Sequence, residues 1–228
     1  MGKNLPQKQN PTRVRETYLL SAALLAPLVM IWLVFISNQT AADRDITAFI
    51  AGYVTESRTA FLKSVSFLGN HKFLVPANLF LIAGLLYLKR GNTAWRWALA
   101  ALSSLGLMSL IKNLFQRPRP ENPMVEGITN FSFPSGHALM GAVFYGLLIW
   151  LIRQNVRDHR VRNLLITLLV FLLLLIGFSR IYLRVHYTSD VIAGYGIGVC
   201  WLYAVIRVTR GRKSLESGLV QKPEDRPF

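Results

Sequence analysis

The chain has 228 residues, of which 52% are hydrophobic, and a mean hydropathy of +0.36. Its apolar residues gather in long uncharged runs, which argues against a water-soluble protein because soluble helices rarely continue so far without a charge. The net charge is +15, but the basic residues lie around these runs, which favours a membrane protein over a nucleic-acid-binding one. The length suits one domain, and the single cysteine, Cys200, excludes an intramolecular disulfide.

The first apolar run, residues 18–37, contains no charged side chain. About 20 helical residues span roughly 30 Å, the thickness of the hydrocarbon core of a bilayer. Backbone groups in lipid must bond within their own segment, so we expect a membrane-spanning helix. A cleaved signal peptide is the alternative, which the length of the run and the lack of a clear small-residue cleavage site disfavour. Five further runs follow, at 73–88, 96–115, 137–152, 163–179 and 190–208.

Between the first and second runs, residues 43–70 place apolar side chains at helical spacing among charged ones. This pattern predicts one or two amphipathic helices. Two arrangements fit it equally well: helices that lie on the membrane interface, and a cap packed over the bundle. The expected fold is therefore an all-α bundle of six transmembrane helices, with an amphipathic helical segment between the first two spans.

Four basic segments fall on one side of the membrane if the chain crosses it six times: both chain ends and the loops after the second and fourth runs. Because lysine and arginine accumulate on the cytoplasmic side, we expect one membrane-embedded domain, 1–228, with cytoplasmic tails at 1–16 and 209–228. The expected location is a bacterial inner membrane, with the segment 43–70 extracytoplasmic. The basic residues are Lys3, Lys8, Arg13, Arg15, Lys89, Arg90, Arg96, Arg153, Arg157, Arg160, Arg162, Arg207, Arg210, Arg212 and Lys213.

The last apolar run contains Gly194 and Gly198, four residues apart. Small residues at this spacing allow membrane helices to pack closely. Together with Gly196 they resemble a fragment of a nucleotide-binding loop, but no strand precedes them. Close helix packing is therefore the favoured interpretation, and Cys200 in the same run is expected to be a small buried hydrophobe.

Ionisable residues also occur at the opposite ends of the later runs. Lys112 lies inside the third run, and His137 begins the fourth. Charged groups at membrane depth are costly and are functional by default, and a bound anion would account for the cations among them. Arg117 and Arg184, beside this group, are expected to contact lipid headgroups or to lie on the outer surface.

The segment NFSFPSGHALMG places Ser135 and Gly136 at the expected start of a helix. Free N–H groups at a helix N-terminus bind anions, and glycine lets the backbone approach closely. Lys112, Arg119 and Arg180 can add charge-assisted donors, and arginine presents a planar fork that matches phosphate oxygens. These residue types together indicate a phosphate-binding cradle.

Two histidines and one carboxylate complete the polar group. His186 and Asp190 are four residues apart, which places them on one face if the segment is helical. Asp190 can accept the proton of one ring nitrogen and leave the other nitrogen as a nucleophile. His137 comes from a different run and can protonate a departing oxygen. The residue types therefore indicate phosphoryl transfer through a histidine.

The order of these residues resembles the signature of the type 2 phosphatidic acid phosphatase superfamily, which also includes vanadium haloperoxidases. That signature has three parts: Lys, six residues, Arg-Pro; then Pro-Ser-Gly-His; then Ser-Arg, five residues, His, three residues, Asp. All three parts occur in order. The matching residues are Lys112, Arg119, Pro120, Pro134, Ser135, Gly136, His137, Ser179, Arg180, His186 and Asp190.

The resemblance implies a role for each residue. His186 attacks phosphorus and forms a phosphohistidine, Asp190 orients the attacking ring, and His137 acts as general acid and then activates water. It also implies that no metal or other cofactor is needed. The residues expected to hold the phosphoryl oxygens are Lys112, Arg119, Ser135, Gly136 and Arg180.

We therefore expect an integral membrane phosphatase acting on a lipid phosphate or pyrophosphate, of the undecaprenyl pyrophosphate, phosphatidylglycerol phosphate or phosphatidic acid class. A lipid A-type phosphatase and a lipid phosphotransferase are alternatives at the same site. A haloperoxidase has no need of membrane spans, and an anion transporter would place charges along the spans rather than at one end. The expected partners are the lipid substrate and the bilayer, without nucleic acid or an obligate protein partner.

Overall fold

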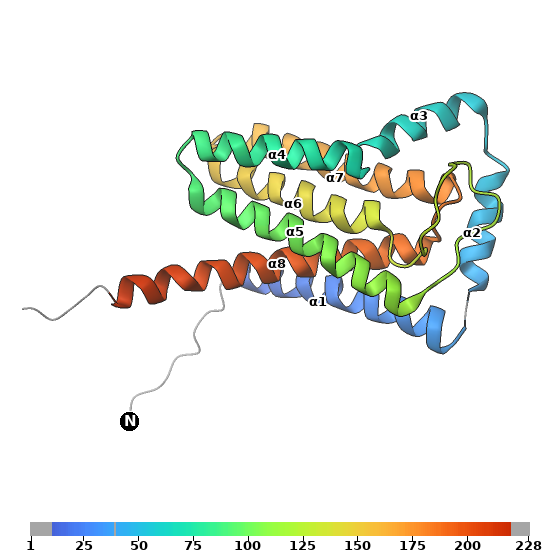
Figure 1. Ribbon diagram of the computed structural model, residues 1–228, viewed down its shortest axis with the longest axis horizontal. Helices are drawn as coiled ribbons and strands as arrows, with labels where there is room; N and C mark the ends of the chain where they lie inside the picture. Colours follow the sequence, from blue (N-terminus) through green and yellow to red (C-terminus); the bar gives the residue numbers. More distant parts are fainter. Residues whose placement is uncertain (1–10, 39, 220–228) are drawn as a thin grey trace, which may run out of the picture.

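The computed structural model describes residues 11–38 and 40–219, with side chains described between 21 and 209. No strand occurs among the described residues, which form a bundle of helices (Figure 1). The elements are α1 Pro11–Ile31 with its π-helical continuation η1 Trp32–Ile36, α2 Ala41–Ala51, α3 Glu56–Phe67, α4 His71–Tyr87, α5 Gly91–Phe115, α6 Gly136–Asn155, α7 His159–Tyr182 and α8 Thr188–Leu219.

Within the described residues, four helices are long and apolar enough to cross a membrane: α5, α6, α7 and the Thr188–Thr209 part of α8. A fifth span would be the bent pair of Ser21–Ile36 and α2, whose axes differ by 99°. Helix α4 has 17 residues, the lower end of the length that crosses a bilayer. Long helices therefore cover all six predicted runs, and a count of six spans stays a prediction.

Side chains cap several helices at the turns between them. The side chain of Asn70 accepts a hydrogen bond from the Lys72 N–H at 2.9 Å at the start of α4. Asp158 caps α7 in the same way, by accepting from two backbone N–H groups. These caps satisfy donors that the first helical turn leaves free, so each helix begins at a defined residue.

Within the described residues, the expected basic segments after α4 and α6 and at the end of α8 lie at one end of the bundle (Figure 1). Arg90, before α5, donates to the Asn155 side chain at the end of α6 at 2.8 Å, and Arg96 donates to the Thr209 carbonyl of α8 at 3.2 Å. Helix α2 and the loop 116–135 lie at the other end (Figure 1). Of the expected tails, residues 1–10 and 220–228 lie outside the described residues, while α8 continues to Leu219.

The segment 43–70 forms two helices, α2 and α3, and α2 crosses the end of the bundle (Figure 1). Asp43, in the first turn of α2, is buried, whereas Phe49 and Phe61 are exposed. The segment thus has a polar group turned into the protein and aromatic groups turned outward. Of the two expected arrangements, the burial of Asp43 favours the cap packed over the bundle.

Helix α8 packs closely against α6 through its glycines. A Cβ atom at Gly194 would lie 2.8 Å from the Ser135 carbonyl oxygen, and one at Gly198 would lie 2.6 Å from that of Leu139. Distances this short leave no room for a side chain, so the two backbones approach as far as glycine allows. The packing interpretation of this glycine pair is therefore confirmed.

Apolar side chains occupy both the interior and the outside of the bundle. Trp97 is fully buried, and its indole N–H donates to the Asn78 side chain at 2.6 Å. Outward-facing residues such as Phe80, Leu110 and Leu114 are largely exposed. An outer surface of this kind suits a hydrocarbon environment, in which helices keep their backbone hydrogen bonds internal.

The α6–α8 contact yields the first prediction. Replacing Gly198→Ala should destabilise the protein by about 1–3 kcal/mol, because the new methyl group meets backbone that cannot move aside cheaply. Gly106→Ala in α5 is the matched control, since a Cβ there meets nothing within 4 Å. The measurement is thermal unfolding of detergent-solubilised protein, and equal unfolding temperatures for the two variants would contradict the packing.

Candidate active site

The predicted site residues lie together around a cavity of about 600 Å³ at the end of the bundle that carries α2. The α3–α4 turn and the loop 116–135 complete its wall. Ser135 and Asp190 are fully buried and lie behind the lining residues. The predicted residues that line the cavity are Lys112, Arg119, Gly136, His137, Arg180 and His186.

His186 lies in the turn between α7 and α8, with its two ring nitrogens facing different surroundings. Its Nε2 is 3.4 Å from Arg119 Nη1, on the cavity side. Its Nδ1 is 3.6 Å from Asp190 Oδ2 and 3.4 Å from the Ser132 hydroxyl. The carboxylate thus stands behind the ring, although 3.6 Å is longer than a hydrogen bond. The sequence predicted that His186 and Asp190 share one face of a helix. In the structure His186 precedes α8, and the α7–α8 turn brings its ring next to Asp190 instead.

Burial governs the charge of His186. Loss of hydration lowers its pKa from the ordinary 6.5 to about 3, against the opposing effect of the Asp190 carboxylate. The imidazole is therefore neutral at pH 7. A neutral ring keeps a lone pair on one nitrogen, which a nucleophile requires.

Three cations of the predicted site line the cavity without a carboxylate partner among the described residues, and so does the exposed Lys72 at the start of α4. Lys112 Nζ donates to the Phe131 carbonyl, and Arg119 Nε donates to the Asn130 carbonyl at 2.7 Å. Arg180 donates to a serine hydroxyl of α3. These carbonyls and this hydroxyl are neutral, so the three cations are unbalanced in the sense that none forms an ion pair with a carboxylate in the described part of the chain. A bound anion would balance them through charge-assisted hydrogen bonds.

Five buried side-chain polar atoms have no hydrogen-bond partner in the described part of the chain: Trp150 Nε1, Thr188 Oγ1, and three in the predicted site, which are Ser135 Oγ, His137 Nε2 and Arg180 Nε. Buried polar groups are ordinarily paired. His137 and Arg180 line the cavity, where a phosphate would offer oxygens to pair with them. The orphan atoms therefore support the same ligand as the unbalanced cations.

Two glycines bring backbone close to the site. Gly136 begins α6, and a Cβ there would lie 2.7 Å from the Met108 sulfur. Gly69, in the α3–α4 turn, lies against His137, since a Cβ would stand 3.0 Å from His137 Cδ2. The turn thus limits where the His137 ring can lie.

One expectation is wrong. Arg117 was expected at the lipid headgroups or the outer surface, but it is buried and pairs with Asp43 and Asp190. Arg184 remains partly exposed. The structure also adds residues that no sequence signal distinguishes: Ser132, Asn130 and Ser66 bond to the predicted ones. They lie in loops or in α3, outside the signature.

Metal ligands are not grouped in the described residues. No three His, Cys, Asp or Glu side chains there lie together as they would around a metal ion. Asp43 and Asp190, the buried carboxylates of this region, are both paired with Arg117.

The sequence resembles characterised phosphatases. Phosphatidylglycerophosphatase B of Bacillus subtilis (strain 168) is 24% identical over 145 residues, which are 63% of this chain and 71% of that protein. A dihydrosphingosine 1-phosphate phosphatase of Saccharomyces cerevisiae is 24% identical over 174 residues, which are 72% of this chain and 42% of the yeast protein.

Two solved structures share the fold. A transmembrane PAP2 type phosphatidylglycerolphosphate phosphatase from Bacillus subtilis superposes with a TM-score of 0.76 at 21% identity, over 90% of this chain and all of that one (100%). LpxE of Aquifex aeolicus gives a TM-score of 0.58 at 23% identity, over 74% of this chain and 97% of that one. At these identities the likeness concerns the fold alone.

The family model described as the PAP2 superfamily matches residues 93–214, more than half of the chain. That range contains every predicted site residue, from Lys112 to Asp190. The chain therefore belongs to the PAP2 superfamily.

Proposed function

We propose that the protein hydrolyses a lipid phosphate or pyrophosphate in the membrane through a phosphohistidine at His186. The observation that carries the proposal is the geometry of His186: Nε2 faces the cavity, while the buried Asp190 carboxylate stands behind Nδ1. A neutral imidazole with its proton on Nδ1 would direct the lone pair of Nε2 at the cavity, where the unbalanced cations, Arg119 at 3.4 Å among them, would hold a phosphoryl group.

The proposed reaction has two steps. In the first, His186 Nε2 forms a bond to phosphorus, the bond to the leaving oxygen breaks, and His137 gives that oxygen a proton. In the second, His137 takes a proton from water, which attacks phosphorus, releases phosphate and frees His186. The residues proposed to hold the phosphoryl oxygens are Lys112, Arg119, Ser135, Gly136 and Arg180. The cations would supply the charge stabilisation, so we propose that no metal is required.

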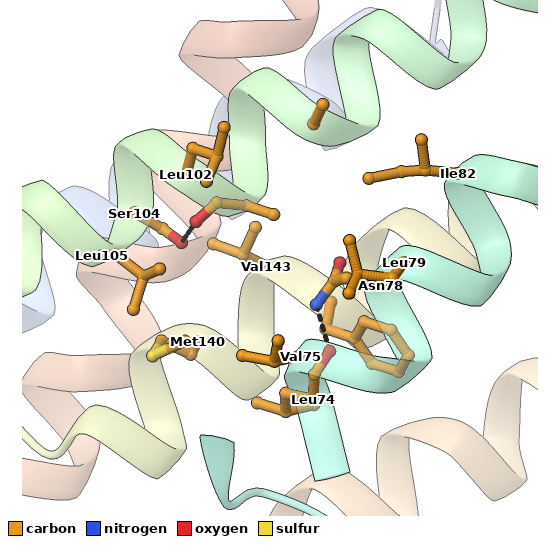
Figure 2. Close-up of a pocket in the computed structure, with 13 residues that line it drawn as sticks. Leu74, Val75, Asn78, Leu79, Ile82, Leu102, Ser104, Leu105, Met140 and Val143 are labelled. Atoms are coloured by element: carbon orange, nitrogen blue, oxygen red, sulfur yellow. Dashed lines mark hydrogen bonds between the residues drawn. The ribbon is translucent and has the colours of Figure 1, made fainter. Parts of the chain in front are cut away.

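An apolar cavity next to the site favours a lipid as the substrate. It has a volume of about 290 Å³ and lies between α4, α5 and α6 (Figure 2). It shares Leu105 and Met140 with the catalytic cavity. Its polar side chains are turned to backbone carbonyls: Asn78 donates to that of Leu74 at 2.7 Å, and Ser104 donates to that of Ala101 at 2.8 Å. A hydrocarbon chain could therefore lie here while its phosphate reaches His186.

The identity of the lipid rests on the relatives. The name of the Bacillus subtilis relative makes phosphatidylglycerol phosphate the first substrate to test. Phosphatidic acid, undecaprenyl pyrophosphate and lipid A phosphates present the same anion on an apolar body, and transfer to a lipid acceptor would use the same intermediate. The cations would bind the phosphate and not the hydrocarbon chain, so they do not distinguish among these lipids.

The basic end of the bundle supports an orientation in the membrane. Lysine and arginine mark the cytoplasmic side, so we propose six spans with both termini in the cytoplasm of a bacterial cell. The site and α2 would then lie at the extracytoplasmic face of the inner membrane, and the substrate would enter from the outer leaflet.

The nucleophile can be tested by substitution. His186→Ala should reduce phosphate release from lipid phosphates by at least about 10³-fold, because it removes the nitrogen on which the proposed covalent intermediate forms. The control is His159→Ala, at the opposite end of α7. Phosphate trapped on the wild-type protein under conditions that avoid acid should map to His186. Turnover in His186→Ala comparable with the wild type would refute the mechanism.

The apolar cavity predicts a dependence on chain length. Ala101→Phe should fill it and lower kcat/KM for a long-chain lipid phosphate by about tenfold, since each buried methylene contributes about 0.8 kcal/mol. A water-soluble phosphate ester should be hydrolysed as by the wild type. Leu164→Phe, on the exposed face of α7, is the control. Equal losses for the two substrates would mean that the cavity does not hold the chain.

The proposed orientation predicts a labelling pattern. In a Cys200→Ala background, cysteine replacing Glu126 should react with a membrane-impermeant thiol reagent added to spheroplasts. Cysteine replacing Asn155 should react only after the membrane is opened. Both positions are exposed in the structure, so a difference reports the side of the membrane. The reverse pattern would place the site at the cytoplasmic face.

A further inference from the structure

Arg117 lies at the centre of a buried ion-pair network, with a side chain that is 6% exposed. Its Nη2 donates to Asp43 Oδ2 at 2.8 Å, and its Nη1 donates to Asp190 and, at 2.8 Å, to the Ser189 hydroxyl. The guanidinium carbon stands 4.2 Å from the centre of the Tyr187 ring. Arg117 is therefore bonded to protein groups and does not line the catalytic cavity, which distinguishes it from the unbalanced cations.

Asp43 connects this network to α2. One carboxylate oxygen accepts from the Ser189 N–H at 3.0 Å, and the other accepts from the Ser189 hydroxyl and from Arg117. Ser189 lies in the first turn of α8, directly before Asp190. A single buried side chain of α2 thus holds both the cation that contacts Asp190 and the residue that precedes it.

The two oxygens of Asp190 have separate partners. Oδ1 accepts from Arg117. Oδ2 accepts from the Ser132 hydroxyl and from the Tyr187 N–H at 2.9 Å, and it faces His186 Nδ1. A carboxylate held at both oxygens cannot rotate freely. The orientation of Asp190, and through it that of the His186 ring, therefore depends on Arg117.

From this network, and resting on the function proposed above, we infer that Asp43 and Arg117 are positioning residues for the reaction. Asp43 holds the guanidinium of Arg117, Arg117 holds Asp190, and Asp190 directs His186 Nε2 into the cavity. Helix α2, which carries no residue of the signature, would therefore help to position the reacting groups in addition to covering the end of the bundle.

The charge balance supports the same conclusion. A fully buried carboxylate needs a paired cation, because removing one partner of a buried pair leaves an uncompensated charge. Arg117 supplies that cation to Asp190, and Asp43 takes up part of its charge. The other ionisable groups that act on Asp190 are His186 and Tyr187 from the α7–α8 turn, Lys112 from α5 and Arg119 from the loop 116–135.

The decisive variant is Asp43→Asn, compared with Asp45→Asn in the full-length protein. Asp45 lies on the same helix but is exposed. Asp43→Asn should lower kcat for a lipid phosphate about 10- to 100-fold, the scale of a misoriented reacting group. KM should change by less than about threefold, because the cations around the cavity are retained. Asp45→Asn should behave as the wild type in both constants.

Arg117 variants test whether catalysis requires the positive charge of Arg117 or its planar guanidinium, which contacts Asp43 and Asp190 at once. Arg117→Met should move the acid limb of kcat/KM to higher pH, because a carboxylate without its cation takes up a proton more readily. Arg117→Lys should keep the limb near its wild-type position, since the charge remains, but lower kcat because one ammonium cannot hold Asp43 and Asp190 together. Asp43→Asn should not move the limb to higher pH.

Thermal unfolding of each variant distinguishes a loss of positioning from a loss of stability caused by weaker packing of α2 against the bundle. Folded Asp43→Asn protein with wild-type kcat and pH profile would overturn the inference, whatever its unfolding temperature. Should Arg117→Met not fold, Asp43→Asn and Arg117→Lys decide by the same criterion. The proposed function can be refuted independently: it is wrong if the wild-type protein is inactive on every lipid phosphate. If the wild type is active, His186→Ala is inactive and Asp43→Asn has normal activity, only the positioning role is refuted.

Discussion

A carboxylate without any exposed surface determines the arrangement at the α2 end of the bundle. Asp190 is 0% exposed, and a buried charge is tolerated only where it is paired and hydrogen-bonded. Its partners come from two separate parts of the chain: Arg117 and Ser132 from the loop 116–135, and the Tyr187 N–H from the α7–α8 turn. Compensating this one group therefore ties an otherwise irregular loop to the start of α8.

Helices α6 and α8 begin side by side, held by a backbone hydrogen bond. The Ser135 N–H donates to the Asp190 carbonyl at 3.0 Å, and Gly194, one turn further along α8, lies against the Ser135 carbonyl oxygen. The start of α6 and the carboxylate are thus held by one close helix contact. A larger residue at Gly194 would separate the start of α6 from the start of α8, so the packing of these two helices also fixes how Gly136 lies relative to Asp190.

Two kinds of cation coexist within a short distance. Arg117 is balanced by two carboxylates, whereas Lys112, Arg119 and Arg180 bond to neutral groups among the described residues. The first kind is paired within the protein, and the second is the kind that we propose binds an anion. An apolar cavity begins beside the second kind. This juxtaposition of unbalanced charge and hydrocarbon surface matches a ligand with an anionic head and an apolar tail.

The sequence by itself determined the all-α bundle and the eight candidate residues, because uncharged runs in lipid can only be helices and because the signature lies within one stretch of the chain. It could not place Arg117 or explain the segment 43–70. Arg117 and Asp43 are 74 positions apart, and an arginine in a polar loop has the same neighbours in sequence whether it faces headgroups or a buried carboxylate. Only the tertiary structure decided that, because the folding of α2 across the bundle end removes both groups from water and leaves each as the other's partner.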